Sequence, residues 1–440
     1  MVAAGENRVL FEQLRAASSL VERTLVRPVH YPQVLDEFSG RRARNRFMNM
    51  ARDEYLTRKK TNCGTKLCGL LMLLGTAGCP PAVIVPPPNG GDEIVDGNRD
   101  GAQPGEPNDD FSESVVAVFD ANGVARLQGT VEIIGDLDVF LLGGFSPGDR
   151  IIVDAFAFDS EIDVSIALFD AEGRLVFAND DHEDASGFTL DSLADLSVRH
   201  AGDSYYLVVT HSAFASTGQF LGSYHVDIQK ESGVEVPQPV GQTLLLDFNG
   251  AIVDSPVLGT FAIEPFDAAD ISAFYDGDTQ TIKDSIRDVF EQNYERFNIT
   301  ILTTDDEPPA PGAEFTVVFF GGFDRGVFGL AENVDLYNFD RCDDAIIFTE
   351  SFSPAVFRDI PTAVELGIAI GNVGTHEAGH LLGLNHTDDD LDLMDDQSPA
   401  DAFLEDQEFM EAPLSDDIMP IGTQDGVLLL IETVGPREEN

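Results

Sequence analysis

The sequence of 440 residues contains no tryptophan and is poor in basic residues and in cysteine. Its 26 Lys and Arg stand against 78 Asp and Glu, which gives a formal net charge of −52 at pH 7. Contacts to a phosphate backbone require Lys and Arg, so this composition argues against a nucleic-acid-binding protein. Four cysteines are too few for a disulfide-stapled scaffold. A length of 440 residues allows about two to four domains. Hydrophobic residues make up 43% of the chain, so these domains are expected to fold around cores of their own.

The charge is unevenly distributed along the chain. Residues 1–66 carry 13 Lys and Arg against 7 Asp and Glu, whereas the remainder carries 13 against 71. This basic segment leads into an apolar run, residues 67–74, and then into small residues that end at Cys79. The order is typical of an export signal, and the run is too short to span a bilayer. We therefore expect a signal over residues 48–79, preceded over residues 1–47 by either a translated extension or an over-long gene prediction.

The sequence Thr-Ala-Gly-Cys at residues 76–79 resembles a bacterial lipoprotein cleavage box, in which the cysteine becomes the lipid-bearing first residue. The resemblance implies lipidation of Cys79 and export from a bacterial cell. The protein is then lipid-anchored at the cell envelope, or secreted if no lipid is added, and the lipid is its only expected membrane contact. Residues 80–105 are rich in Pro, Gly and Asp and predict an extended tether. Cys342 alone follows Cys79 and is expected to be a free thiol.

Residues 106–230 contain short runs of β-branched and aromatic residues between Gly and Asp turns, for example at 164–169. Many short strands at regular spacing predict an all-β, antiparallel sandwich. The segments EPNDD at 106–110, GDLDVF at 135–140 and GDSYY at 202–206 resemble the bacterial pre-peptidase C-terminal (PPC) domain. That resemblance implies an accessory role in substrate or surface binding, folding or secretion.

Several oxygen-bearing side chains in the turns of this region are of the type that Ca²⁺ prefers. They are Glu106, Asn108, Asp109, Asp136 and Asp138. Calcium binding by PPC relatives supports a site here. Asp and Asn also populate β-turns without any metal, so the sequence leaves calcium and a simple turn function as alternatives.

After a linker over residues 231–240, residues 241–440 have the mixed pattern of an α/β (α+β) domain. Apolar residues at helical spacing predict a helix over residues 282–297, and a second helix begins near Pro361, since proline is tolerated in a first turn. A third is expected over residues 424–434. The predicted strands lie at residues 244–248, 299–303, 315–320, 327–333 and 345–349. The fold class is thus multidomain, a β-sandwich followed by a domain with a twisted mixed sheet and three main helices.

The second helix ends in the sequence HEAGHLLGLNH over residues 376–386. His376 and His380 are four residues apart, so both imidazoles project from one helix face and can bind one metal ion. Gly383 can adopt a left-handed conformation that stops the helix and returns His386 as a third ligand. Three neutral nitrogens leave the fourth tetrahedral position open, which is typical of one catalytic Zn²⁺.

This motif resembles that of the metzincin metallopeptidases. Metzincins carry a methionine in a tight turn beneath the metal, and Met394 lies eight residues after His386. Their order of strands and helices, including an edge strand that binds substrate backbone, is similar to that expected over residues 241–435. No Tyr stands two residues after Met394, which favours the three-histidine coordination of matrixins. Thr387 stands where matrixins carry Ser, so the subfamily stays open.

The resemblance implies a zinc-dependent endopeptidase that acts on protein or peptide substrates. Zn²⁺ would activate a water molecule, and Glu377 would take its proton as general base and deliver it to the leaving amine. The alternative is a surface-binding or adhesion protein whose zinc domain is catalytically silent. The retention of Glu377 beside three histidines argues against that alternative.

Overall fold

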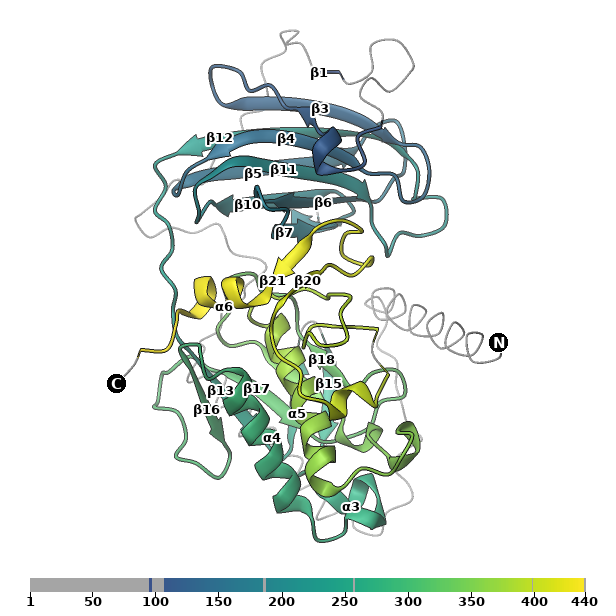
Figure 1. Ribbon diagram of the computed structural model, residues 1–440, viewed down its shortest axis with the longest axis vertical. Coiled ribbons are helices and arrows are strands. Elements are labelled where there is room, and N and C mark those ends of the chain that lie inside the picture. The colour runs from purple at the N-terminus through teal and green to yellow at the C-terminus, as the bar shows by residue number, and fades with distance from the viewer. Residues whose placement is uncertain (1–94, 97–106, 185–186, 256–257, 398, 439–440) are drawn as a thin grey trace. The chain divides into compact units, whose positions relative to one another are not determined.

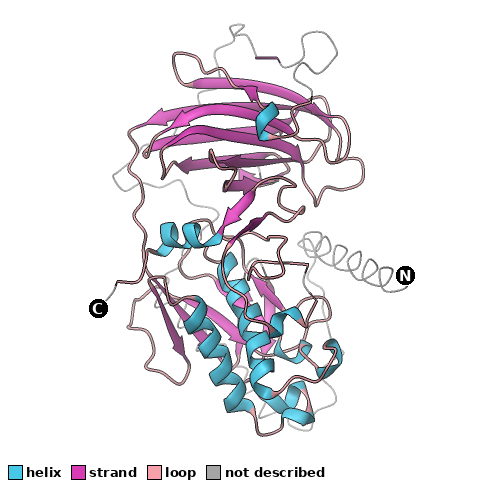
Figure 2. Cartoon of the chain, viewed as in Figure 1, coloured by secondary structure: helices cyan, strands magenta, loops and turns pink. Residues whose placement is uncertain are grey.

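The structure is a computed structural model that describes residues 95–96, 107–184, 187–255, 258–397 and 399–438. The described chain divides into two compact units. One comprises the residues up to 237 together with 413–424, and the other comprises 238–412 together with 425–438. The first unit is built of strands, and the second carries the helices α4, α5 and α6 (Figures 1 and 2). The chain is therefore β-rich and multidomain.

Two five-stranded sheets, with strand orders β1-β3-β12-β5-β10 and β2-β4-β11-β6-β7, make up the first unit. Neighbouring strands are antiparallel except for the pairs β1/β3 and β2/β4. The strands are β1 Val95–Asp96, β2 Val115–Val116, β3 Val124–Val131, β4 Asp138–Phe145, β5 Asp149–Ala157, β6 Val164–Phe169, β7 Leu175–Asn179, β10 Ser192–Ser197, β11 Gly202–His211 and β12 Gly222–Ser232. A separate hairpin is formed by β8 His182–Asp184 and β9 Gly187–Thr189.

Alternation of apolar and polar residues places one face of each sheet in the core between them. On β5, Ile151, Val153 and Ala155 are buried, whereas the residues between them are only partly buried. The inward residues of the other strands join the same cluster. Such alternation is the expected signature of a sheet with one face in the core, so the β-sandwich follows from its local sequence pattern.

The outer face of the second sheet is also apolar, and residues 413–424 cover it. Leu414 and Met419 of this segment are buried against Val139, Phe169 and other residues of that face. This corrects the expectation that all of residues 241–440 belong to one domain. The physical reason is visible in β6, in which every residue is buried because both faces of the strand are covered.

The second unit contains a five-stranded sheet of order β16-β13-β17-β19-β18, in which only β18 is antiparallel to its neighbour. The strands are β13 Gln242–Asp247, β16 Ile299–Thr303, β17 Thr316–Phe320, β18 Gly329–Ala331 and β19 Asp344–Ile347. A further pair of strands in this unit is β14 Ala251–Ser255 with β15 Gly259–Ile263. The paired strands β20 Glu411–Pro413 and β21 Thr423–Asp425 each cross the boundary between the two units. The helices are α3 Ala268–Ile271, α4 Thr279–Asn293, α5 Ala363–His380 and α6 Gly426–Val434.

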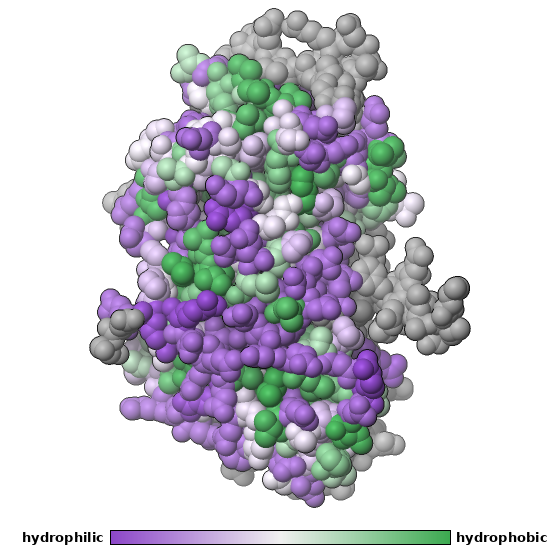
Figure 3. Space-filling view, viewed as in Figure 1, coloured by the Kyte–Doolittle hydropathy of each residue, from purple (hydrophilic) through white to green (hydrophobic). Residues whose placement is uncertain are grey.

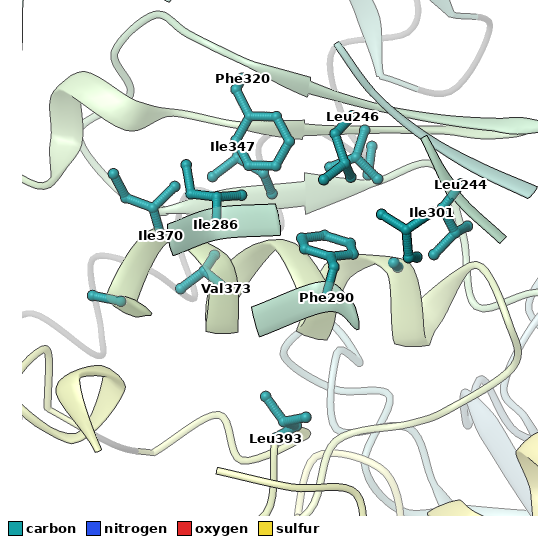
Figure 4. Packing of buried hydrophobic residues seen from close by; sticks show 14 of the residues in the cluster. Leu244, Leu246, Ile286, Phe290, Ile301, Phe320, Ile347, Ile370, Val373 and Leu393 are labelled. Carbon is teal, nitrogen blue, oxygen red and sulfur yellow. The ribbon is translucent and has the colours of Figure 1, made fainter. Parts of the chain in front are cut away.

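Alternate residues of this sheet enter two different cores. Leu244, Leu246 and Phe320 pack with residues of α4 and α5, and Figure 4 shows Ile286 and Phe290 of α4 among them. The residues between them, such as Leu245 and Phe319, instead pack with the β14/β15 hairpin on the other face. Strands buried on both faces are typical of parallel sheets, which explains the continuous apolar sequence of β17.

Glycines on α5 leave room for side chains of α4 to pack directly against the backbone of α5. An added Cβ at Gly367 would lie 2.5 Å from the Cβ of Ser285, and one at Gly371 would lie 2.8 Å from the Cβ of Val289. An added Cβ at Gly374 would lie 2.8 Å from the ring of Phe290. Because α5 ends at His380, this contact fixes the position of the helix that carries the predicted metal ligands.

The predicted helix over residues 282–297 ends earlier, at Asn293. The prediction was too long because Tyr294 and Phe297 continue the apolar spacing beyond the helix. Both side chains lie in the following turn and are completely buried in the core. The hairpin β14/β15 was not predicted, although its period-two burial is readable in Ala251–Ser255.

In the part of the chain that the structure describes, no helix is long and apolar enough to cross a membrane. On the face shown in Figure 3 hydrophilic residues predominate, as expected for a chain with a formal net charge of −52.

Replacing Phe290 with Ala is expected to destabilise the second unit by about 3–5 kcal/mol, because the ring is completely buried and its loss leaves a cavity between α4, α5 and the sheet. Urea unfolding followed by circular dichroism measures the change. The control is Phe274→Ala, since Phe274 is 61% exposed and its loss should cost little. Equal effects of the two substitutions would contradict this core.

Candidate metal centre

Helix α5 positions two of the three predicted histidines. Thr362 caps its first turn by accepting a hydrogen bond from the backbone N–H of Glu365, whose carboxylate in turn accepts one from the Thr362 N–H. The helix then runs without interruption to His380. His376 and His380 consequently project from the same face of the last turn, as their spacing predicted.

Gly383 ends the helix and redirects the chain toward His386. Its φ is +98°, and its N–H donates to the His380 carbonyl at 2.9 Å. An added Cβ would lie 2.8 Å from the Cα of Leu336, so both conformation and space require glycine. The turn therefore brings His386 back to the two helical histidines.

The three imidazoles converge on one point. The Nε2 atoms of His376 and His380 lie 3.1 Å apart, and those of His380 and His386 also lie 3.1 Å apart. Among the described residues they form the one group of at least three such side chains whose ligand atoms lie within 4.8 Å of one another. A tetrahedral zinc ion with Zn–N bonds of about 2.0–2.1 Å separates its ligand nitrogens by about 3.3 Å. The spacing of the three nitrogens is therefore compatible with one tetrahedral metal ion.

Backbone carbonyls determine which nitrogen of each helical histidine carries the proton. Nδ1 of His376 lies 2.7 Å from the carbonyl of Leu393, and Nδ1 of His380 lies 2.8 Å from that of Leu384. A carbonyl only accepts, so each Nδ1 must donate, and each neutral ring presents a lone pair on Nε2. Two lone pairs at 3.1 Å repel each other unless a cation lies between them. These residues therefore fit a metal ion.

The surroundings keep the histidines neutral. Burial lowers the pKa of His376 to about 4 and that of His386 to about 3, and it lowers the pKa of His380 well below its usual value. The carboxylate of Asp396 lies 3.7 Å from Nδ1 of His386. A metal ion binds the neutral form of imidazole. Because the three rings are already neutral near pH 7, a metal ion can bind there without first displacing protons from them.

Glu377 lies beside the histidines and is enclosed by β18. Its side chain is buried, and burial raises the pKa of its carboxyl to about 8, while a hydrogen bond with the backbone of Ala331 opposes that rise. An added Cβ at Gly329 would lie 2.4 Å from Oε1 of Glu377. The edge strand therefore restricts the position of the carboxyl group, which occupies a place that only glycine at position 329 leaves open.

Met394 is completely buried next to α5, where an added Cβ at Gly379 would lie 2.7 Å from its Sδ. Thr387 holds the turn that carries it, because the Thr387 N–H donates to the Met394 carbonyl at 3.0 Å and its hydroxyl donates to Asp392 at 2.8 Å. Neither Thr387 nor Asp392 was singled out in this role from the sequence. The short polar residues that precede Met394 in the sequence could have indicated such a hydrogen-bonded turn.

Four of the five predicted calcium ligands are described, and Glu106 lies outside the described residues. Nδ2 of Asn108 donates to one carboxylate oxygen of Asp138 at 2.9 Å, and the Tyr224 hydroxyl donates to the other at 2.6 Å. Asp109 is close enough to Asp136 to raise its pKa further, after burial. Both oxygens of Asp138 already accept hydrogen bonds, and the geometry gives no separate support for a cation. Calcium at this site stays a prediction.

Two cysteines, Cys79 and Cys342, were assigned roles from the sequence. Cys79, the predicted lipidation site, lies outside the described residues. Cys342 is buried and disulfide-bonded, which corrects the expectation of a free thiol.

No known protein-family profile and no curated protein matches the chain. Solved structures are similar to parts of it. Archaemetzincin from Methanopyrus kandleri is 14% identical over 39% of this chain and 91% of its own, with a TM-score of 0.22. The pre-peptidase C-terminal domain of collagenase from Bacillus anthracis is 11% identical over 26% and 94%, with a TM-score of 0.20. PliG, a periplasmic inhibitor of g-type lysozyme from Aeromonas hydrophila, is 13% identical over 27% and 96%, with a TM-score of 0.21. These scores are too low to argue function, which is argued from the site itself.

Replacing Gly383 with Ala is expected to weaken zinc binding at least tenfold, because the positive φ and the collision with Leu336 displace His386. Competition with a chromophoric chelator measures the affinity. Gly277→Ala is the matched control, since Gly277 has a φ of +92° but nothing lies within 4 Å of an added Cβ. The same zinc affinity in both variants would contradict the role of this turn.

Asp138 provides a pH prediction for the sandwich. Burial raises the pKa of its carboxyl to about 6, so between about pH 4 and pH 6 the folded protein holds a proton that the unfolded chain has lost. Stability relative to Asp138→Asn should therefore fall by about 3 kcal/mol as pH rises through that window. Urea unfolding at pH 4 and pH 7 with EGTA present measures it. A relative stability that stays level or rises with pH would contradict the assignment.

Proposed function

We propose that this chain is a zinc-dependent endopeptidase of the metzincin type. The observation that carries the proposal is the convergence of three histidine Nε2 atoms, with neighbouring separations of 3.1 Å. Glu377, which follows His376 in the sequence, is also buried. A structural zinc site usually has four protein ligands, whereas this one offers three within the described residues. Three histidine ligands therefore suit a catalytic zinc ion whose fourth coordination position is open to water or substrate.

His376, His380 and His386 would hold the zinc ion through Nε2. When bound, zinc acts as a Lewis acid that makes water nucleophilic near neutral pH and polarises the scissile carbonyl. The backbone carbonyls of Leu384 and Leu393 keep Nδ1 protonated and fix the plane of each helical imidazole. The protein thus supplies a ligand set whose orientation is fixed before any ion binds.

Glu377 would move the proton. Its carboxylate takes a proton from the attacking water and returns it to the nitrogen of the leaving amine, so no covalent bond to the protein forms. The burial that raises its pKa favours holding that proton between the two transfers, whereas a bound cation lowers the pKa again. Gly329 and Ala331 restrict where the carboxyl can lie while it does so.

A peptide substrate would lie along β18. This strand is at the edge of the sheet and pairs with β19 on one side. Edge strands bind extended peptides through backbone hydrogen bonds, which require no particular side chain. Since Gly329 contacts Glu377, a peptide bound along this edge has its backbone close to the proposed base. The substrate class is therefore protein or peptide.

The remaining sequence predictions complete the proposal. Residues 48–79 would direct export from a bacterial cell, with Cys79 as the lipid-bearing residue of an envelope-anchored protein or with simple secretion as the alternative. The sandwich would act as a PPC-like accessory domain, with calcium bound near Asn108 and Asp138 as a further prediction. In this proposal the N-terminal segments determine where the protein is located, the sandwich has an accessory role, and the second unit carries out peptide hydrolysis.

Glu377→Gln should keep one bound zinc and lose on the order of 10²–10⁴-fold in the rate of casein cleavage, because the amide cannot take up a proton. Zinc content is measured by mass spectrometry and cleavage by release of acid-soluble peptides, both on the full chain. The matched control is Glu307→Gln, at an exposed position, which should cleave at the unmodified rate.

Each other outcome separates the alternatives. Undiminished cleavage by Glu377→Gln would remove this residue from the mechanism. Bound zinc without cleavage of any unstructured protein, by the unmodified chain or the variant, would favour a surface-binding or adhesion protein with a silent zinc domain. Absence of zinc from the purified protein after zinc reconstitution would overturn the proposal.

A further inference from the structure

Residues 413–424 form a hairpin that belongs to the β-sandwich, although the chain on both sides of it belongs to the second unit. Strands β20 and β21 pair with each other at its base. The side chains of Leu414 and Met419 are 5% and 0% exposed, and they pack with Val139 and Phe169 on the outer face of a sandwich sheet. The sandwich therefore binds a segment that the second half of the chain contributes.

The hairpin fits this face closely and is also hydrogen-bonded to it. The Thr423 N–H donates to the Gly173 carbonyl at 3.0 Å. Gly422 has a φ of +88°, and an added Cβ there would collide with the ring of Phe169 and lie 2.9 Å from the Gly173 carbonyl oxygen. Because position 422 leaves no room for a side chain, the hairpin is held on the sandwich in one defined position.

The residues just before the hairpin contact the metal centre. The Leu393 N–H donates to the Glu408 carbonyl at 3.2 Å, and the Leu393 carbonyl accepts the Nδ1 proton of His376. Phe409 is 2% exposed, and an added Cβ at Gly379, in the last turn of α5, would lie 3.4 Å from its ring. Residues 408–409 therefore contact both the residue whose carbonyl orients His376 and the helix that carries His376.

The residues just after the hairpin are bonded to the same stretch of chain. The Asp425 carboxylate accepts a hydrogen bond from the Leu428 N–H at 2.9 Å and thereby caps α6. The Gly426 N–H donates to the Met410 carbonyl at 3.0 Å. Both ends of the hairpin are therefore fixed in the second unit, one of them three residues after Met410.

We propose that the sandwich is a positioning element of the metal centre. By binding the hairpin it would fix Glu408 and Leu393, and through them the imidazole of His376. Loss of a group that orients a metal-bound imidazole typically lowers metal affinity by about 10–100-fold. This role goes beyond the accessory one expected of a PPC-like domain, and it rests on the proposed zinc-peptidase function.

A simpler role for the hairpin is to cover the apolar outer face of the sandwich. In that case its release would expose apolar surface and favour association between molecules. Zinc affinity would then be unchanged, because the orientation of His376 would not depend on the hairpin. Zinc affinity therefore distinguishes the positioning role from simple coverage.

The test is Met419→Asp in the full chain, because a charge buried against Val139 and Phe169 is strongly unfavourable and releases the hairpin. Zinc affinity, measured by competition with a chromophoric chelator, should fall at least tenfold. Met419→Leu should retain the affinity, since leucine conserves volume and polarity. The matched control is Ile134→Asp, at a sandwich position that is 69% exposed, and it should bind zinc normally. Unchanged affinity in Met419→Asp would overturn the proposal.

Hydrogen exchange of the unmodified chain gives a second readout that does not depend on a variant folding well. Coupling between two sites is reciprocal, so zinc binding should slow amide exchange within residues 413–424. Strand β10, at the edge of the other sandwich sheet, is the internal control and should exchange equally with and without zinc. Exchange of residues 413–424 that does not respond to zinc would contradict the positioning role.

Failure of this inference and failure of the proposed function give different results. A zinc affinity that falls in Met419→Asp, in a chain that does not cleave casein, would support the positioning role and contradict the peptidase. Zinc affinity and casein cleavage that are the same in Met419→Asp and the unmodified chain would overturn the positioning role alone.

Discussion

The proposed metal centre depends on one electrostatic constraint, the mutual repulsion of imidazole lone pairs. Two backbone carbonyls force the protons of His376 and His380 onto Nδ1, so the Nε2 atoms meet at 3.1 Å with no hydrogen between them. Only a cation turns that arrangement into a favourable one. The free energy for holding the lone pairs together must come from the surrounding fold, and much of the second unit can be understood as that support.

The support comes from close packing and from turns. Glycines on α5 let the helix lie directly against α4, and a completely buried Met394 fills the space behind its last turn. The carbonyls that orient the imidazoles belong to Leu384 and Leu393, which lie in the turns that follow the helix. The same turns bring back His386. The helix, the turns that follow it and the three histidines are therefore held in place by the same set of contacts.

The convergence of the three histidines was predictable because it depends on local geometry. Histidines four residues apart on a helix, followed by a turn glycine, occupy one face whatever the rest of the chain does. The carbonyls of Leu384 and Leu393 were not predictable, since any residue can supply a carbonyl. Period-two patterns predicted the sandwich, but no periodicity assigned Leu414 and Met419 to its outer face, because that contact joins distant segments. The burial of Asn338 likewise follows from a loop conformation that its sequence does not specify.

X-ray absorption at the zinc edge of the full chain, reconstituted with one equivalent of zinc, tests the central claim most directly. The account predicts three imidazole nitrogens at about 2.0–2.1 Å and one further light-atom ligand in tetrahedral geometry. Loss of one nitrogen in His386→Ala would identify the third ligand. A shell containing sulfur, or six oxygens, would contradict the account, because it would place zinc elsewhere and leave the three converging lone pairs without their cation.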